Sequence, residues 1–129
     1  MSIPHAYAAA PDDLYRALGE TAGINRIVDE MLRIVPEDGR IAASFKDTNM
    51  KRLGILIKEQ FCVQSGGPCT YSGDPMRETH EQLGIRSAQF NALVEDLQLA
   101  MERCGIDAAS QNRLLALLAP MKRDIVAPR

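Results

Sequence analysis

Apolar residues recur at intervals of three or four along most of the chain, which is the spacing of one face of an α-helix. The first such stripe lies between residues 24 and 35, and a turn-forming stretch follows it at residues 36–39. Its members are Ile24, Ile27, Val28, Met31, Leu32 and Val35. A second stripe covers residues 90–104 and precedes Gly105, a residue type that commonly ends helices. The pattern predicts two amphipathic helices.

Three further segments carry helix signals. Residues 50–64 precede a Ser-Gly-Gly-Pro stop, and the candidate N-cap residues before them are Asp47, Thr48 and Asn49. A short helix is predicted to begin after Asp74 and to end at Gly84. Pro120 should bend or shorten the last helix, whose apolar stripe is Leu114, Leu118, Met121 and Ile125. No segment alternates with a period of two, so the sequence predicts an all-α fold of about six helices.

The composition is that of an ordinary globular domain. The chain has 129 residues, of which 46% are apolar and 25% are charged. We expect an N-terminal tail over residues 1–10 and a single domain over residues 11–129. The formal net charge is −2 and no stretch forms a basic stripe, so no binding to nucleic acid or to an acidic membrane surface is expected.

Targeting signals are also missing from the sequence as it stands. The longest apolar runs, such as residues 114–120, are too short to cross a bilayer, so no membrane insertion is expected. Residues 1–11 lack the basic and continuous apolar regions of a signal peptide. Three cysteines, an odd number, argue against a secreted disulfide framework. A cytoplasmic location is expected, or a periplasmic one if a leader has been removed.

His80 is the strongest candidate for site chemistry. The other histidine, His5, lies in an Ala- and Pro-containing tail and is expected to be exposed. Met76, His80 and Leu83 are spaced to share one face of the short helix, so the imidazole points inward. Such a histidine is either a core residue bonded to a backbone carbonyl or a ligand. With three Phe, three Tyr and no Trp, the core has few large side chains and leaves room for a flat cofactor.

Residues 66–85 resemble the matching segment of the truncated haemoglobins of the first group. That family carries GGP, then Y-x-G, then M-x-x-x-H-x-x-L-x-I, and this chain has all three motifs in that order. Three further segments resemble the family in order and spacing: LYRALG at residues 14–19, RIAASF at residues 40–45 and LAPMKRDIV at residues 118–126. The resemblance covers nearly everything between residues 14 and 126.

This resemblance implies a two-over-two helical sandwich that encloses haem, with His80 as the proximal ligand of the iron. Covalent attachment of a c-type haem needs a Cys-x-x-Cys-His motif, which is absent, so haem b is the expected cofactor. The residues expected to contact it are Leu32, Phe45, Leu53, Ile57, Phe61, Met76, His80, Leu83, Ile85, Phe90 and Leu93.

The distal positions depart from the pattern of many relatives, which have Tyr at the position of Leu32 and Gln at that of Ile57 to hydrogen-bond bound oxygen. On residues 50–64, Leu53, Ile57 and Gln60 share one narrow sector, and Gln60 points either toward this site or toward solvent. The expected function is reversible binding of O₂, CO and NO by a monomer or weak dimer. The alternatives are a haem enzyme, either a nitric-oxide dioxygenase or a weak peroxidase with an external reductase, and a haem-based redox or gas sensor.

The cysteines and carboxylates leave simpler alternatives. Cys62 and Cys69 have six residues between them and form either a disulfide or, as the sequence favours, two free thiols. A zinc site that joins them to His80 would lack a fourth ligand. Cys104 continues an apolar stripe and is expected in the core. The acidic pairs at residues 37–38 and 95–96 are expected on solvated faces or at loop ends.

Overall fold

The computed structural model describes residues 12–72 and 86–122, and all regular structure within these ranges is helical. The α-helices are α1 (Asp13–Ala17), α2 (Glu20–Ile34), α3 (Met50–Gln64), α5 (Ser87–Arg103) and α6 (Ala108–Leu118). Three short 3₁₀ helices are η1 (Val35–Glu37), η2 (Ala42–Phe45) and η3 (Ala119–Met121). The prediction of an all-α fold is confirmed for this part of the chain. The predicted short helix between Asp74 and Gly84 lies outside the described residues.

The predicted helix boundaries depend on local signals that the structure bears out. Asn49 is the N-cap of α3, and its side-chain oxygen accepts a hydrogen bond from the Arg52 amide at 3.0 Å. The second stripe becomes α5, with Gly105 two residues past its end at a φ of 77°. Pro120 lies in η3 directly after α6, so the predicted shortening of the last helix is confirmed.

α2 begins four residues before its apolar stripe because of a tight elbow with α1. Gly19 has a φ of 97°, which L-residues rarely adopt. A β-carbon on Gly23 would overlap the carbonyl oxygen of Leu18, so only glycine lets the two helices approach this closely. The elbow therefore sets where α2 begins, and no hydrophobic spacing reveals it.

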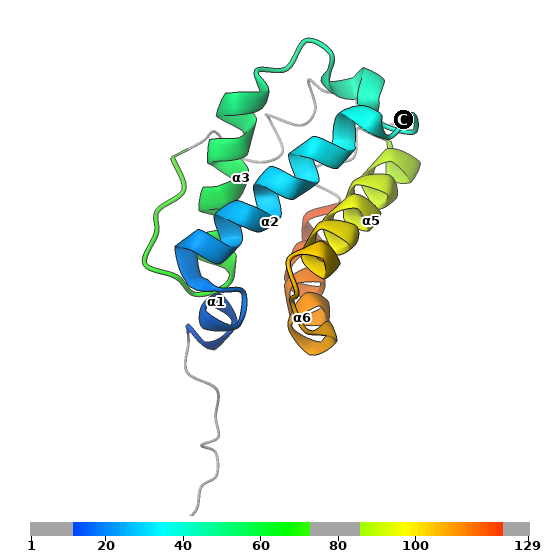
Figure 1. Ribbon diagram of the computed structural model, residues 1–129. Coiled ribbons are helices and arrows are strands. Elements are labelled where there is room, and N and C mark those ends of the chain that lie inside the picture. The colour runs from blue at the N-terminus through cyan, green and yellow to red at the C-terminus, as the bar shows by residue number, and fades with distance from the viewer. Residues whose placement is uncertain (1–11, 73–85, 123–129) are drawn as a thin grey trace, which may run out of the picture.

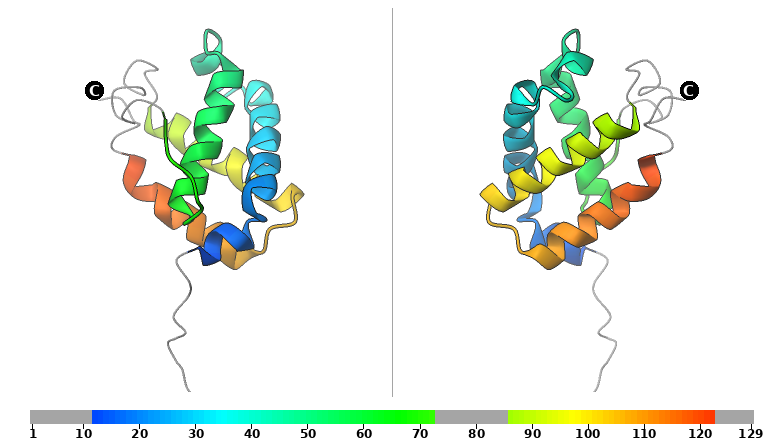
Figure 2. Two further views of the ribbon diagram at one scale, coloured as in Figure 1. Left: turned by 90° about the vertical axis from the view of Figure 1, so that its left-hand side faces the viewer. Right: turned by 90° about the vertical axis from the view of Figure 1, so that its right-hand side faces the viewer.

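The long helices form two antiparallel pairs. In Figure 1, α2 rises while α3 descends, and α5 descends while α6 rises. Figure 2 shows α2 beside α3, with α5 and α6 running obliquely to them. α2 packs against both α3 and α5, and α6 contacts α1, α3 and α5. The fold is therefore two packed layers of two helices each.

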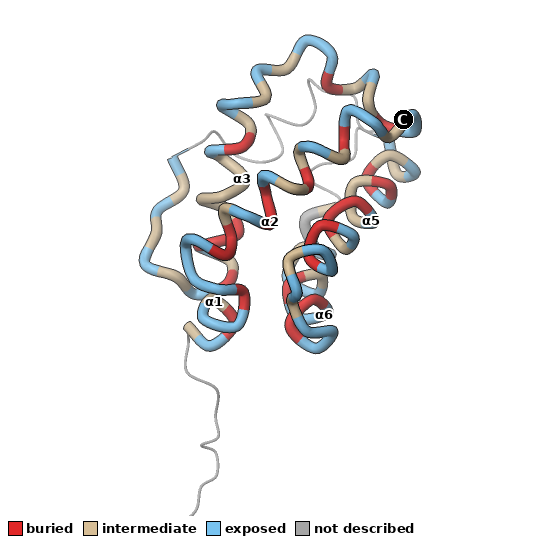
Figure 3. The backbone as a smooth tube through the Cα atoms, viewed as in Figure 1, coloured by how far each residue is buried: buried red, intermediate tan, exposed pale blue. Residues whose placement is uncertain are grey.

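The core lies between these pairs, where the buried positions of the helices face inward (Figure 3). The predicted stripe of α2 is the buried one: Ile24, Ile27, Val28, Met31 and Val35 are at most 2% exposed. Leu32, which belongs to the same stripe, is only half-buried. None of the described helices has the length and hydropathy that a membrane span requires.

Ion pairs on the surface join helices that are distant in sequence. Arg103 Nη1 of α5 lies 2.8 Å from Glu30 Oε2 of α2, and Arg113 Nη1 of α6 lies 3.0 Å from Asp13 Oδ2 of α1. Exposed pairs of this kind each contribute about 0–1 kcal/mol. The packed apolar core therefore stabilises the arrangement far more than these pairs do.

Candidate functional site

Apolar side chains from α2 and α3 meet at the position where the sequence predicts a distal surface. Leu53 and Ile57 of α3 are half-buried and pack against the core, as does Leu32 of α2. Leu32 Cδ1 lies 3.0 Å from the position that a β-carbon on Gly54 would take. The absence of a side chain at Gly54 therefore lets Leu32 lie directly against α3.

The predicted contact residues within the described ranges belong to a single apolar cluster. Phe45 of η2, Phe61 of α3 and Phe90 of α5 are buried, and Leu93 of α5 is half-buried against them. With Leu32, Leu53 and Ile57, seven of the predicted residues from α2, η2, α3 and α5 therefore belong to the hydrophobic core or pack against it. Four predicted residues lie outside the described part of the chain: Met76, His80, Leu83 and Ile85.

This cluster fits the apolar body of a haem. Leu32, Leu53, Ile57 and Leu93 each pack on the core yet stay partly uncovered, although leucine and isoleucine are usually buried. A flat, mostly apolar group covering these side chains would complete their burial. The side-chain chemistry of the described residues therefore suits haem.

Lys122 places a cation beside this cluster, and the sequence pattern does not predict its position. Lys122 Nζ lies 5.9 Å from the centroid of the Phe90 ring and donates a hydrogen bond to Asn91 Oδ1 at 3.3 Å. Phe90 lies in the first turn of α5 and Lys122 directly after η3, so neither spacing nor a motif links them. The contact places a positive charge next to one of the predicted haem contacts.

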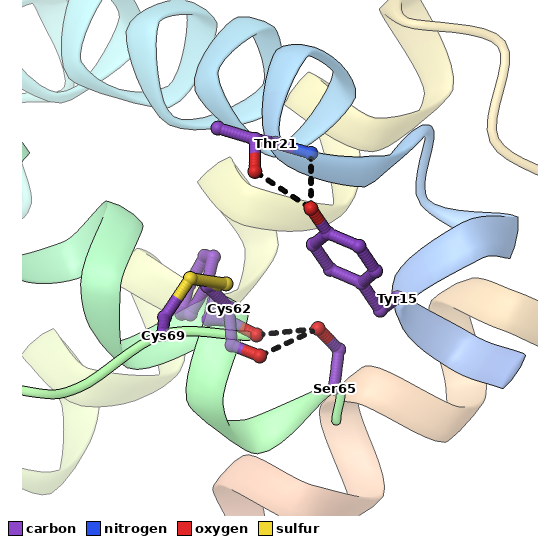
Figure 4. The surroundings of a disulfide bond; sticks show 6 residues. Tyr15, Thr21, Cys62, Ser65 and Cys69 are labelled. Carbon is purple, nitrogen blue, oxygen red and sulfur yellow. Dashed lines mark hydrogen bonds between the residues drawn. A yellow bond between two sulfur atoms is a disulfide. The ribbon is translucent and has the colours of Figure 1, made fainter. Parts of the chain in front are cut away.

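The loop after α3 contains a disulfide between Cys62 and Cys69, so the expectation of two free thiols is wrong (Figure 4). The chain turns back because the Gly67 amide donates to the Cys62 carbonyl at 2.8 Å and the Cys69 amide donates to the Gly67 carbonyl at 2.9 Å. This turn brings the two cysteine Cα atoms to 6.0 Å, which a disulfide spans. Cys104 is free and half-buried against the core, as expected.

An ionic cluster of Asp38, Arg40, Glu95 and Asp96 joins the loop after η1 to α5. Arg40 lies 2.9 Å from Asp38, 2.6 Å from Glu95 and 3.7 Å from Asp96. Asp96 is 5% exposed, and its Oδ2 has no hydrogen-bond partner among the described residues. The expectation of a solvated acidic pair is therefore wrong for Asp96, although it holds for the exposed Glu95.

The two aspartates of this cluster titrate in opposite directions. Burial, followed by the adjoining Asp38 carboxyl, raises the pKa of Asp96 to about 6. Hydrogen bonds from the Arg40 guanidinium hold the pKa of Asp38 well below its usual range. Near neutral pH both carboxyls are ionised, so Asp96 then carries a charge that is poorly solvated and close to a like charge.

The sequence model of the bacterial-like globins matches residues 13–127. The chain belongs to this family. The globin is 30% identical to the group 1 truncated hemoglobin GlbN of Synechocystis sp., with 88% of this chain and 96% of the relative covered. It is 28% identical to the group 1 truncated hemoglobin GlbN of Mycolicibacterium paratuberculosis, with 91% and 86% covered. The resemblance to truncated haemoglobins of the first group is thus confirmed, and family membership supports a haem-binding role.

Solved structures confirm the fold of this globin. The truncated hemoglobin of Tetrahymena pyriformis in its Fe(III) form gives a TM-score of 0.85 at 23% identity, covering 89% of this chain and 98% of that one. The 2/2 hemoglobin of Synechococcus sp., solved in the cyanomet state with covalently attached heme, gives 0.81 at 23% identity, covering 88% and 97%. The predicted two-over-two arrangement is therefore correct.

Proposed function

We propose that this globin holds haem b through His80 and binds O₂, CO and NO reversibly at an apolar distal surface. The observation that carries the proposal is the packing of Leu32 against α3 at Gly54, beside Leu53 and Ile57. None of these three leucine and isoleucine side chains has a hydrogen-bond donor. The family match over residues 13–127 supports a single globin domain over residues 11–129, which follows a tail over residues 1–10.

When bound, haem would be held by the His80 imidazole and would supply an iron that can bind a diatomic gas. Leu32, Leu53 and Ile57 would exclude water from the gas side, and Phe45 and Phe61 would pack the ring system. A polarised O₂ ligand gains about 1.5–3 kcal/mol from a hydrogen-bond donor, and these side chains offer none. We therefore expect O₂ to leave quickly, while CO, which is much less polarised, loses little.

Gln60 supports a second candidate function. Its side chain is half-buried on α3, three residues beyond Ile57, and it carries an amide donor. If this amide reaches the gas ligand, O₂ would be held long enough for oxidation of nitric oxide, or the site would act as a weak peroxidase. Repeated oxidation of nitric oxide needs an external reductase to supply electrons, whereas a peroxidase needs hydrogen peroxide and a reducing substrate.

Optical spectra of the ferric, ferrous and CO forms, followed by stopped-flow O₂ dissociation, test both candidates. Fast O₂ release and rapid autoxidation support gas binding at an apolar surface. Slow O₂ release that Gln60→Leu accelerates supports the enzyme. A protein that takes up no haem overturns both candidates.

A further inference from the structure

We propose that the Cys62–Cys69 disulfide is a redox-sensitive clamp on the loop at residues 65–72, and that its reduction loosens haem binding. The loop connects α3 to the part of the chain that contains His80. α3 itself carries Leu53 and Ile57, the proposed distal residues. The disulfide therefore joins two parts of the chain. One is α3, which carries the proposed distal residues, and the other is the loop that leads to the segment with His80. The effect on haem rests on the proposed function, whereas the effect on the loop does not.

Two contacts with α3 restrain the second half of the loop. One is the disulfide at Cys69, and the other is Glu59, whose Oε1 accepts hydrogen bonds from the Ser72 amide at 2.8 Å and the Ser72 hydroxyl at 2.7 Å. Glu59 and Cys62 are three residues apart, and so they lie on one side of α3. The loop thus runs back along this side of the helix, and the disulfide is its one covalent restraint among the described residues.

The first half of the loop is held independently of the disulfide. The Tyr15 amide donates to the Ser65 carbonyl at 3.0 Å, and the Ser65 hydroxyl donates to the Phe61 carbonyl at 2.7 Å. The Tyr15 hydroxyl is fixed in turn by a 2.7 Å hydrogen bond to the hydroxyl of Thr21 (Figure 4). The Tyr15 ring lies so close to Gly67 that a β-carbon there would come within 2.5 Å of it. Reduction removes the covalent restraint on residues 68–72 and leaves the hydrogen bonds of residues 65–67 in place, so the second half of the loop should open more often than the first.

The two sulfur atoms differ in solvent exposure, and this difference decides which of them a reductant attacks. Cys62 is 3% exposed, whereas Cys69 is half-buried, so a thiolate of a dithiol reductant attacks Cys69 Sγ. This attack forms a mixed disulfide and expels the Cys62 thiolate, which takes up a proton. The second thiolate of the reductant then displaces the Cys69 thiolate, which is also protonated. The pair gains two electrons and two protons, and the reductant leaves as a disulfide.

Closure of a short loop by a disulfide lowers the population of its opened states, and the loop-closure relation gives an upper limit of about fiftyfold for a loop of this length. We expect amide hydrogen exchange at Cys69 and Ser72, which both donate hydrogen bonds, to accelerate by up to this factor after reduction. Exchange at the Gly67 amide, in the part of the loop held by Tyr15, should change much less.

The test compares the haem-loaded protein before and after treatment with dithiothreitol. Mass spectrometry confirms the thiol state, hydrogen exchange follows residues 65–72, and transfer of haem to excess apomyoglobin gives its dissociation rate. Cys104→Ser is the matched control, because it removes the free cysteine and leaves the disulfide. The double variant Cys62→Ser, Cys69→Ser should resemble the reduced protein and should not respond to the reductant.

Faster exchange confined to residues 68–72, together with haem dissociation that is at least severalfold faster, supports the proposal. Unchanged exchange in these residues overturns the clamp, and faster exchange with unchanged haem dissociation overturns its effect on the haem site. A protein that takes up no haem in either state overturns the proposed function instead, and the exchange measurement then decides the clamp by itself.

Discussion

Replacement of Asp96 by asparagine should remove a pH dependence from the stability of this globin. The pKa of Asp96 is raised to about 6 in the folded protein, whereas an aspartate in an unfolded chain titrates near 3.9. The folded state therefore binds this proton more tightly than the unfolded state does. For such a group the free energy of unfolding is highest below pH 4, falls as the pH rises through the folded pKa and is lowest above it.

The displacement of the Asp96 pKa from 3.8 to about 6 corresponds to about 3 kcal/mol over the whole titration, of which about 2 kcal/mol falls between pH 4 and pH 7. Asp38 changes the free energy of unfolding with pH in the opposite sense. Arg40 lowers the pKa of Asp38, so the stability that the ionised Asp38 contributes is lost only as the pH falls below about 4. Measurements between pH 4.5 and pH 7 thus isolate Asp96. An asparagine amide can donate a hydrogen bond to Asp38, as a protonated carboxyl does, and it never ionises. Asp96→Asn should therefore be about 1–3 kcal/mol more stable than the parent at pH 7.

Urea unfolding followed by circular dichroism, repeated across this pH range, measures the effect. The difference between parent and variant cancels the titration of the histidines and other shared groups. Glu95→Gln is the matched control, because Glu95 is the adjacent carboxylate on α5, also pairs with Arg40, and is exposed. If the stability of Asp96→Asn falls with pH as steeply as that of the parent, Asp96 is not the group responsible.

Four other outcomes follow from the same residues. His80→Ala should yield protein without haem, or with haem that needs added imidazole; full haem with an unchanged optical spectrum would contradict the assignment of the ligand. Ile57→Gln or Leu32→Tyr should slow O₂ dissociation, measured by stopped flow, by about tenfold or more, because each adds a hydrogen-bond donor. If the parent protein already releases O₂ slowly, and Gln60→Leu does not change that rate, the distal residues are wrongly assigned. Gly67→Ala should lower stability by about 1–3 kcal/mol in urea unfolding, because its β-carbon would lie 2.5 Å from Tyr15 Cδ1 and 2.6 Å from Cys62 Sγ; Gly39→Ala, which meets nothing within 4 Å, is its control. Acidified organic solvent should extract the haem and leave an apoprotein with a lower Tm, and equal melting temperatures would argue against a haem-filled core.

Local features of this fold are readable from the sequence, and features made by distant segments are not. The stripe of α2 and the cap at Asn49 involve residues within one or two helical turns, so spacing and residue type predict them. Asp96 lies beside predicted apolar positions of α5, and it is buried because the loop with Asp38 and Arg40 covers it. Nothing near Asp96 in sequence signals that loop.

The same distinction between local and distant contacts applies to the candidate site. Family motifs predict which side chains surround the haem, and the seven of these that the structure describes all belong to the hydrophobic core or pack against it. The disulfide depends on how the loop turns at Gly67 and on the contact of that glycine with Tyr15, which is distant in sequence. The spacing of two cysteines allows closure but does not specify the turn, so the sequence favours the wrong state.

The contact between α1 and α6 has a consequence for the order in which the chain folds during synthesis. α1 leaves the ribosome before the other described helices, whereas α6 is the last α-helix described. α1 contacts α6, and Asp13 of α1 pairs with Arg113 of α6. α2 and α3 are complete much earlier and can pair while translation continues. α1, whose Leu14 is 3% exposed in the finished protein, would have to wait for α6 before all its helix contacts are made. A nascent chain stopped before α6 would therefore expose this apolar end of the molecule to chaperones and proteases.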